Sequence, residues 1–351
     1  MILTENSHFS IRQETISALY RLQRKNTRHT YESGNSKWRR LTTVQDLGRF
    51  GYMNKGFQVS GAVDDQAMRL ANILVGNDQK EAVLEATIMG PSIRFTAPAV
   101  IAMAGANMTP KLNGTAMPLY EAVEVHAGDT LVCGFAMTGC RGYLAVAGGF
   151  AVEPVLGSRS TNLKCGLGGY EGRALKTGDV LELRTEKATL PHMEKRKVNA
   201  AEGSFQTPVS ADKLPVLRVV PGPQSEYFTE KGQKTFAEQA YTVTQDSNRM
   251  ACKLTGEAIE FVTSGDIISD GITTGSVQIS SSGMPIVMLA DHQTTGGYAK
   301  IGTVISTDIP AIGQRKPGEK VRFSYISVEE AQKLNLERKK YLDTLDKKIN
   351  G

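Results

Sequence analysis

Five consecutive polar residues follow a short apolar run late in the chain, and they include most of the groups that acid–base chemistry needs. The run Ile286 to Ala290 leads into Asp291, His292, Gln293, Thr294, Thr295 and a diglycine turn, with Tyr298 and Lys300 just beyond. Strand ends of this kind commonly present groups to small molecules. Asp291 could act as a general base, Gln293 and the two threonines could bind a carbonyl or ureido group, and Lys300 could neutralise an oxyanion. Alternatively, Asp291 and Thr294 cap turns and His292 faces solvent.

Two arginine turns, both earlier in the chain, are candidate anion sites. Arg49 lies between Gly48 and Gly51, so the backbone can approach a ligand while the guanidinium offers a planar fork to a carboxylate or phosphate. In the alternative, Arg49 pairs with Asp46 across the turn. Ser158, Arg159 and Ser160 follow a glycine and resemble an anion nest, although a solvated hairpin has the same composition. Further candidate binding residues accompany these segments: Ser60, Asp64, Asp270 and Gln278.

Several common catalytic motifs are absent from the sequence. It contains no GxxxxGK[ST], GxGxxG, GxSxG or HExxH pattern, and no tetrapeptide that would accept biotin covalently. The glycine loop at 166–172 misses the dinucleotide-binding spacing by one residue. The four cysteines show no CxxC spacing and no histidine stands at ligand spacing beside them, so we expect no metal site. Reduced cysteines and the absence of a secretory leader indicate a cytoplasmic protein.

The charge distribution argues against a nucleic-acid partner. The formal net charge is +5 over 351 residues, and the first 40 residues account for it with eight Lys/Arg against three Glu. The remaining chain is neutral, with no basic stripe that would attract phosphate backbones. No apolar run approaches the ~18 residues needed to cross a bilayer, so we expect no membrane partner.

The elements that must position these residues are mostly short strands. Glycine followed by an acid and then alternating residues recurs at 128, 178, 265 and 318, and predicts a turn entering a strand. One internal helix is expected over 63–75, with Asp64 and Asp65 in its first turn, where they also favour the helix dipole. The pattern predicts barrels or sandwiches over 41–184 and 216–327, a solvated linker over 185–215 and a C-terminal helix from 328. Residues 1–40 are expected to be a disordered extension, with an organelle transit peptide as the alternative.

Several long strings resemble the biotin-dependent carboxyltransferase family, also called allophanate hydrolase subunit 2-like. They include LTTVQDLGRFGY (41–52), VSGAVDDQAMRLANILVGN (59–77), LGSRST (156–161), ISDGITTGSVQ (268–278) and LADHQTTGGYAKIGTVIS (289–306). The resemblance covers roughly residues 41–327. This chain departs from the family pattern at His292, where arginine is frequent, and at Asn248–Ala251.

This resemblance implies a mainly β protein with two cyclophilin-like β-barrel domains, few helices and a C-terminal helix. The family includes the C subunit of 5-oxoprolinase, whose complex couples ATP hydrolysis to opening of a lactam, and the resemblance favours this role. ATP would be the cofactor, bound either by this chain or by a partner, and the partners would be a KipI-like B subunit together with a lactam-utilisation A subunit. Biotin would not be attached to this chain. The alternatives are a carboxyltransferase component of the urea carboxylase or allophanate hydrolase type, and a KipA-like anti-inhibitor of a histidine kinase.

Overall fold

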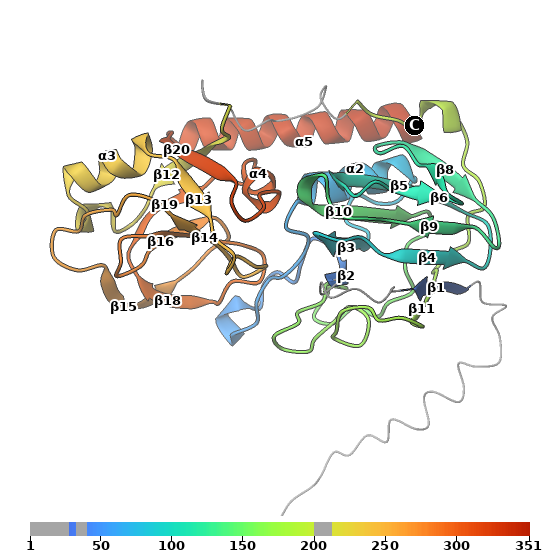
Figure 1. Cartoon of the computed structure of the whole chain (residues 1–351), viewed down its shortest axis with the longest axis horizontal. Helices are drawn as coiled ribbons and strands as arrows, with labels where there is room; N and C mark the ends of the chain where they lie inside the picture. Colours follow the sequence, from blue (N-terminus) through green and yellow to red (C-terminus); the bar gives the residue numbers. More distant parts are fainter. Residues whose placement is uncertain (1–27, 33–40, 200–212) are drawn as a thin grey trace, which may run out of the picture.

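Two β-rich domains lie side by side in a computed structural model, and one long helix runs along both of them (Figure 1). The structure describes residues 28–32, 41–199 and 213–351. The mainly β class expected from the sequence is confirmed. Among the described residues, no helix is both long and apolar enough to cross a membrane.

The first domain is built from two antiparallel sheets. The five-stranded sheet has the order β2 (Leu41–Gln45), β3 (Val83–Thr87), β10 (Thr138–Val146), β5 (Ala99–Asn107) and β8 (Ala122–Val125). The six-stranded sheet has the order β11 (Val180–Glu182), β1 (Arg28–Glu32), β4 (Ser92–Phe95), β9 (Thr130–Val132), β6 (Lys111–Leu112) and β7 (Thr115–Ala116). An apolar core that includes Leu84, Phe95 and Leu144 joins the two sheets. In the described residues this domain therefore consists of two packed sheets instead of the closed barrel expected from the resemblance.

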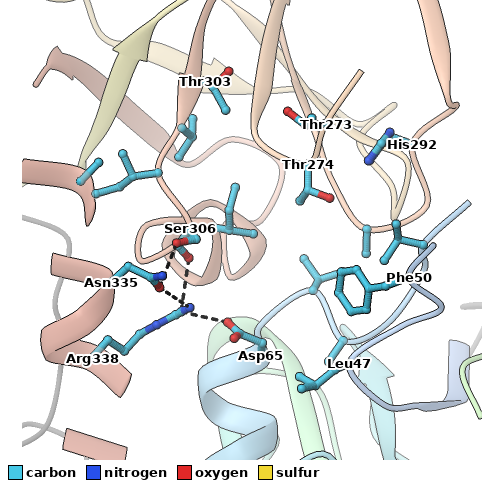
Figure 2. A pocket seen from close by; sticks show the side chains of 18 of the residues that line it. Leu47, Phe50, Asp65, Thr273, Thr274, His292, Thr303, Ser306, Asn335 and Arg338 are labelled. Atoms are coloured by element: carbon cyan, nitrogen blue, oxygen red, sulfur yellow. Dashed lines mark hydrogen bonds and ion pairs between the residues drawn. The ribbon is translucent and has the colours of Figure 1, made fainter. Parts of the chain in front are cut away.

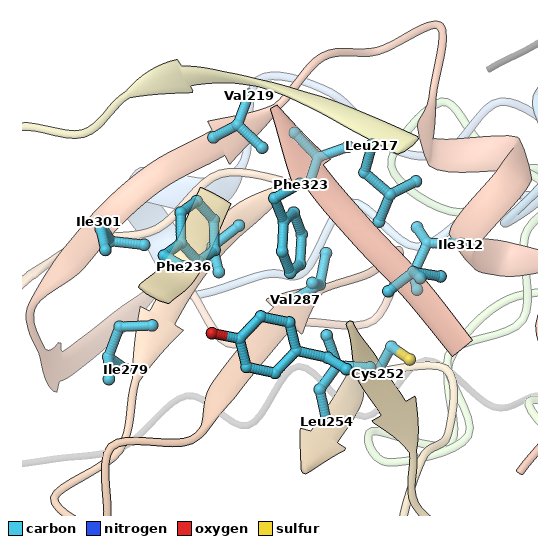
Figure 3. Close-up of a cluster of buried hydrophobic side chains, with 14 of the residues drawn as sticks. Leu217, Val219, Phe236, Cys252, Leu254, Ile279, Val287, Ile301, Ile312 and Phe323 are labelled. Carbon is cyan, nitrogen blue, oxygen red and sulfur yellow. The ribbon is translucent and has the colours of Figure 1, made fainter. Parts of the chain in front are cut away.

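The second domain is a closed barrel, as expected. Its strand order is β12 (Val216–Pro221), β19 (Lys300–Val304), β16 (Ser276–Ile279), β17 (Pro285–Met288), β14 (Ala251–Thr255), β13 (Tyr241–Val243) and β20 (Lys320–Tyr325). The barrel is filled by aliphatic and aromatic side chains (Figure 3). Phe236 of α3 (Glu230–Glu238) stacks on Phe323 with ring centroids 4.4 Å apart. A separate two-stranded sheet, β15 (Asp266–Gly271) and β18 (Thr295–Tyr298), lies beside the barrel.

The helices connect the domains. The expected internal helix is α2 (Asp65–Leu74), and the side chain of Asp64 caps it by accepting from Ala67 N at 2.8 Å. The C-terminal helix is α5 (Val328–Asn350), which begins at a capping box formed by Ser327 and Glu330. It returns to the first domain, where Leu342 and Ile349 enter the core beneath α2. The short α4 (Ile309–Gly313) links β19 to β20, and three 3-10 turns occur at Met53–Lys55 (η2), Met193–Lys195 (η3) and Ser225–Tyr227 (η4).

Two predicted boundaries differ from the structure. Residues 28–32, expected to belong to a disordered extension, form β1 between β11 and β4, and the rest of 1–40 lies outside the described residues. The first half of the predicted solvated linker is anchored: Arg196 is buried and donates to Leu74 O at 3.1 Å and to Asn350 Oδ1 at 2.8 Å. Arg196 thus pairs with acceptors at the C-terminal ends of α2 and α5. The polar composition of the segment could not predict these contacts.

Candidate functional site

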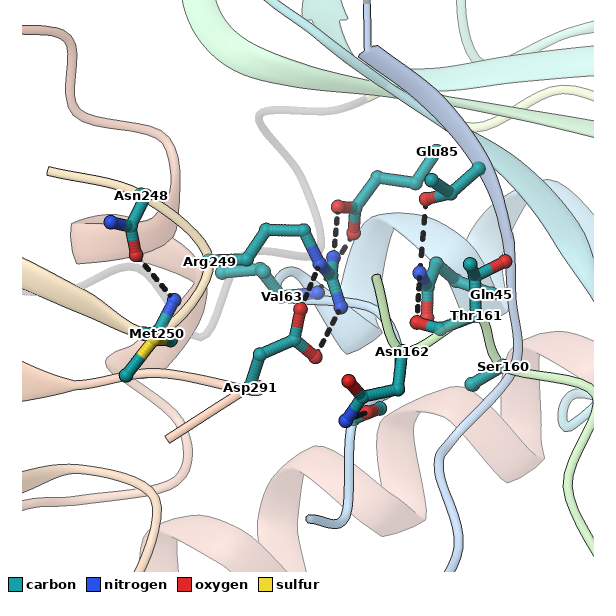
Figure 4. Close-up of polar contacts among 12 residues, drawn as sticks. Gln45, Val63, Glu85, Ser160, Thr161, Asn162, Asn248, Arg249, Met250 and Asp291 are labelled. Carbon is teal, nitrogen blue, oxygen red and sulfur yellow. Dashed lines mark hydrogen bonds and ion pairs between the residues drawn. The ribbon is translucent and has the colours of Figure 1, made fainter. Parts of the chain in front are cut away.

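A buried ion network joins the two domains (Figure 4). Arg249, in the turn before β14, donates through Nε to Asp291 Oδ2 at 2.8 Å and through Nη2 to Asp291 Oδ1 at 3.2 Å. Its Nη1 donates to Glu85 of β3, in the first domain, and Nη2 also donates to Gly61 O at 2.6 Å. The guanidinium therefore ties three separate segments together.

The electrostatics of this network keep its members ionised. Burial alone would lower the pKa of Arg249, but the neighbouring carboxylates of Asp291 and Glu85 raise it above the ordinary value. Burial likewise favours neutral Glu85, yet Arg249 and Arg141 outweigh it and hold the pKa of Glu85 below its ordinary value. Such a network offsets the large desolvation cost of each buried charge only while all partners are present.

Asp291 is a member of this network, which changes the role expected for it. Both carboxylate oxygens accept from Arg249, and the backbone N–H of Asp291 donates to Arg249 O at 2.9 Å. A general base needs an oxygen within reach of substrate. In this structure Asp291 instead holds the turn that carries His292 and Gln293.

Two of the candidate segments, the polar stretch after Leu289 and the turn that carries Arg49, meet in the structure. Ser60 N donates to Ala290 O at 3.0 Å, and Gln58 Nε2 donates to Asp291 O at 2.7 Å. Asn162 supports the contact from the first domain by donating to Gln58 Oε1 at 2.5 Å and to Ser60 Oγ at 3.1 Å. The polar stretch after Leu289 therefore lies against the arginine turn.

Arg49 is buried within that turn and is incompletely paired. Its backbone N–H donates to Val59 O at 2.8 Å and its Nη2 donates to Ser160 O at 2.5 Å. The Nε and Nη1 groups have no hydrogen-bond partner among the described residues. Burial lowers the pKa of Arg49 while Asp46 and Asp291 partly restore it. Gly48 is required here, because at φ +101° a Cβ would lie 2.7 Å from Val59 O.

The second arginine turn is filled by an internal carboxylate. Ser158 Oγ donates to Asp46 Oδ1 at 2.6 Å, Ser160 Oγ donates to the same oxygen at 2.5 Å, and Arg159 N donates to Asp46 Oδ2 at 2.6 Å. The side chain of Arg159 donates through Nε to Val152 O at 2.7 Å. The anion nest predicted from the sequence exists, and Asp46 occupies it instead of a ligand. The predicted alternative of an Arg49–Asp46 hydrogen-bonded pair is replaced by these contacts.

A separate polar cluster gathers Lys300, Asp270, Gln278 and Tyr298 beside the barrel. Lys300 Nζ is buried and donates to Asp270 Oδ2 at 2.5 Å and to Gly271 O at 2.9 Å. Gln278 Nε2 donates to Tyr298 O at 3.3 Å. The hydrogen bond from Lys300 lowers the pKa of the exposed Asp270. Thr295 is exposed, and Gln293 and Thr294 are half-buried.

Asp64 lies in the interface between the domains and not in an open site. Its Oδ1 caps α2, and its Oδ2 accepts from Gln314 Nε2, after α4, at 2.7 Å. Burial raises the pKa of Asp64 to about 6, against the opposing hydrogen bonds from Ala67 and Gln314. Asp64, expected in the first turn of the helix beside its dipole, is thus the residue that caps the helix.

A cavity of about 740 Å³ opens between the domains and α5 (Figure 2). Its walls are mostly apolar, and its polar lining comprises Ser60, Asp65, Arg69, Thr273, Thr274, His292, Thr303, Ser306, Gln332, Asn335 and Arg338. Of the predicted site residues only Ser60 lines this cavity. Asp291 and Arg49 do not line it but are next in sequence to the lining residues His292 and Phe50, whereas Lys300 and Asp270 belong to the separate cluster. Its volume is within the ~300–1,000 Å³ typical of small-molecule sites.

Known proteins share this architecture over most of the chain. The family described as carboxyltransferase domain, subdomain A and B, matches residues 55–325. This chain belongs to that carboxyltransferase-domain family. The chain is 36% identical to the C subunit of 5-oxoprolinase from Escherichia coli over 304 residues, which is 87% of this chain and 94% of that protein. It is 31% identical to urea amidolyase of Saccharomyces cerevisiae over 87% of this chain but 17% of that protein.

The solved structures agree with the sequence comparison. Urea carboxylase of Kluyveromyces lactis superposes with a TM-score of 0.80 at 28% identity, covering 93% of this chain and 30% of that chain. The family expected from the sequence strings is thereby confirmed.

The sequence did not predict four residues that build the contacts between the domains of this carboxyltransferase domain: Gln58, Glu85, Asn162 and Arg249. One signal was available: Glu85 is a charged residue within the apolar run VLEAT.

Proposed function

We propose that this chain is the C subunit of an ATP-dependent 5-oxoprolinase complex, which hydrolyses 5-oxo-L-proline to L-glutamate in the cytoplasm. The observation that carries the proposal is the extent of the match: similarity to the C subunit from Escherichia coli spans 94% of that protein, whereas the match to urea amidolyase spans 17%. The remaining components would be a KipI-like B subunit together with a lactam-utilisation A subunit.

The chemistry requires an activated amide. A lactam carbonyl is a poor electrophile, and phosphorylation of its oxygen with ATP makes it open to attack by water. Positive groups near the developing anionic oxygens lower that barrier. In this chain Arg49 offers two buried N–H groups that have no hydrogen-bond partner among the described residues, and Lys300 offers a buried ammonium held by Asp270. Either ATP contacts these groups or a partner protein presents it to them.

The residues around these two cations would orient the substrate. Gln293 and Thr294 precede β18 and Thr295 begins it, on the segment that Asp291 holds. Gln278 pairs with Lys300 across the barrel strands and donates to the backbone carbonyl of Tyr298. We assign ring and carbonyl contacts to this group, and a positioning role to Asp291 because Arg249 takes both of its oxygens. Ser158, Ser160 and Arg159 support Arg49 from behind, through Asp46 and the Ser160 carbonyl.

Reconstitution tests the proposal. The chain is purified with the two partner proteins, and glutamate release from 5-oxo-L-proline is measured with and without ATP. Glutamate release that depends on ATP and on all three proteins is the expected result. Copurification without any such release would contradict the proposed function.

Biotin-dependent carboxyl transfer is the second candidate, favoured by the superposition on urea carboxylase over 93% of this chain. It predicts that the chain works with a biotin carboxylase and a biotinylated carrier, that urea stimulates ATP hydrolysis, and that avidin stops it. The 5-oxoprolinase reaction should be insensitive to avidin. The same purified preparation therefore distinguishes the two reactions.

A further inference from the structure

The turn that follows β12 lies against the backbone of Lys300. Gln224 Oε1 accepts from Lys300 N at 3.2 Å, and Gly222 N donates to Ile301 O at 3.0 Å. A Cβ at Gly222 would lie only 2.2 Å from Lys300 O, so the turn can approach this closely because the residue is glycine. The start of β19, which carries the buried ammonium, is therefore in contact with residues 222–224.

Lys300 stands at an irregularity in the barrel. Val277 of β16 pairs with Gly302 of β19, but the next residue, Gln278, pairs with Lys300. One step along β16 thus matches two steps along β19, which is a β-bulge. Bulges change the direction of neighbouring side chains and are common beside active sites. At this bulge the Lys300 N–H is bonded by a side chain from outside the β16–β19 ladder, that of Gln224.

The ammonium end of Lys300 involves Gln224 as well. Lys300 Nζ donates to Asp270 Oδ2 at 2.5 Å and to Gly271 O at 2.9 Å. Hydrogen bonds from Lys300 and Gly271 lower the pKa of Asp270, and a smaller hydrogen-bond contribution comes from the Gln224 side chain. Gln224 also precedes η4, but its side chain makes no capping hydrogen bond to that turn. Its amide therefore serves Lys300 and the carboxylate that holds Lys300.

We propose that Gln224 is a positioning residue for the Lys300 ammonium in the lactam reaction. Its amide fixes the bulge through the Lys300 N–H and steadies the carboxylate of Asp270, so it determines where the ammonium lies without touching the lactam. The inference rests on the proposed function for the task of Lys300, which is to neutralise an anionic oxygen. It goes beyond that function by naming a residue that the sequence did not place in the site.

The first test measures kcat and KM for 5-oxo-L-proline in the reconstituted complex. Gln224→Met keeps the length of the side chain and removes both of its hydrogen-bonding groups. An ammonium that stabilises a developing anion acts mainly in the transition state, so displacing it lowers kcat more than it raises KM. Misplacing a catalytic group by about 1 Å can cost ~100-fold in rate, and we expect kcat to fall at least ~10-fold with KM nearly unchanged.

Gln233→Met is the matched control. Gln233 is half-buried like Gln224 and lies beside the same turn, but its amide donates to Ser225 O at 3.1 Å and to Phe228 O at 3.4 Å. This variant should keep the kcat of wild type. Circular dichroism verifies that each variant is folded. If Gln224→Met does not fold, Gln224→Asn, whose amide is one methylene shorter, is measured in its place.

The second test does not depend on activity. Trace acetylation of the full chain with acetic anhydride, mapped by mass spectrometry, reports how readily Lys300 Nζ leaves its partners. The rate at Lys300 should rise several-fold in Gln224→Met and stay at the wild-type value in Gln233→Met. Lys253, at an exposed position of β14, provides the internal reference in every sample.

The outcomes separate the inference from the function on which it rests. If the complex releases glutamate and Gln224→Met has the kcat of Gln233→Met, the inference is overturned and the function stands. A loss confined to KM would assign Gln224 to substrate binding and overturn the positioning role. If the wild-type complex releases no glutamate, the function is overturned and acetylation decides the inference. Equal acetylation rates at Lys300 in wild type and Gln224→Met then overturn it.

Discussion

Replacing Arg249 with methionine removes the cation on which two buried carboxylates depend. The Glu85 side chain is 0% exposed and that of Asp291 is 9% exposed. Arg141 remains near Glu85, at 3.9 Å, whereas Asp291 has no second ion-pair partner within the part of the chain that the structure describes. Leaving a buried charge without its partner typically costs ~3–5 kcal/mol. We expect Arg249→Met to lower the free energy of unfolding by about that amount.

Urea unfolding followed by circular dichroism measures this effect. Arg173→Met is the control, because Arg173 also contacts two carboxylates, Glu171 and Asp179, but lies near the surface. Exposed ion pairs contribute ~0–1 kcal/mol, so the control should change little. The penalty for Arg249→Met should be smaller at pH 5 than at pH 8, since carboxylates without the cation take up protons more readily when buried. A loss below ~1 kcal/mol at pH 8, equal to that of Arg173→Met, would refute the reasoning.

Three other predictions follow from single side chains. Lys300→Met should abolish glutamate release by the reconstituted complex without preventing assembly, whereas Lys253→Met, at an exposed position of β14, should retain it. Burial raises the pKa of Asp64 from 3.8 to about 6, so its contribution to stability is greatest below pH ~4 and is lost as the pH rises through 6. Between pH 5 and 8, wild type should therefore lose ~1 kcal/mol of unfolding free energy relative to Asp64→Asn, and equal pH profiles would contradict the assignment. Gly148→Ala should destabilise the protein well beyond Gly178→Ala, although both glycines have similar positive φ. An added Cβ clashes with Thr185 O at Gly148 but meets open space at Gly178. Similar melting temperatures of the two variants would contradict this prediction.

Local features of the fold could be predicted because their causes are local. The helix over 65–74 follows from apolar residues at helical spacing, and Gly76 adopts the left-handed conformation after it at φ +65°, whereas Asp64, expected in the first turn, is the cap. The strands that begin after the turns at 128, 178, 265 and 318 could be predicted in the same way, because glycine followed by an acidic residue favours a turn. Each of these depends on neighbours within a few residues.

The candidate site was predicted less completely because its contacts are distant in sequence. Arg249 and Glu85 are 164 residues apart, and Asp46 and Ser158 are 112 apart. The residue types indicate an anion nest at 158–160 and an acid at 46, yet nothing in their spacing shows that the second fills the first. A charged side chain in an apolar strand, such as Glu85, signals a buried partner without naming it.

The identity of the bridging cation matters for the cavity as well as for stability. Arg249 reaches Glu85 in the first domain, Asp291 in the second and Gly61 O in the turn beside Ser60, which lines the cavity. A lysine carries one compact charge and lacks the planar fork that serves several acceptors at once. Because His292 follows Asp291 directly, the same guanidinium that joins the domains also holds the backbone that carries His292, a residue lining the cavity. The backbone that carries Ser60 and His292 is thus held in part by Arg249, which does not itself line the cavity.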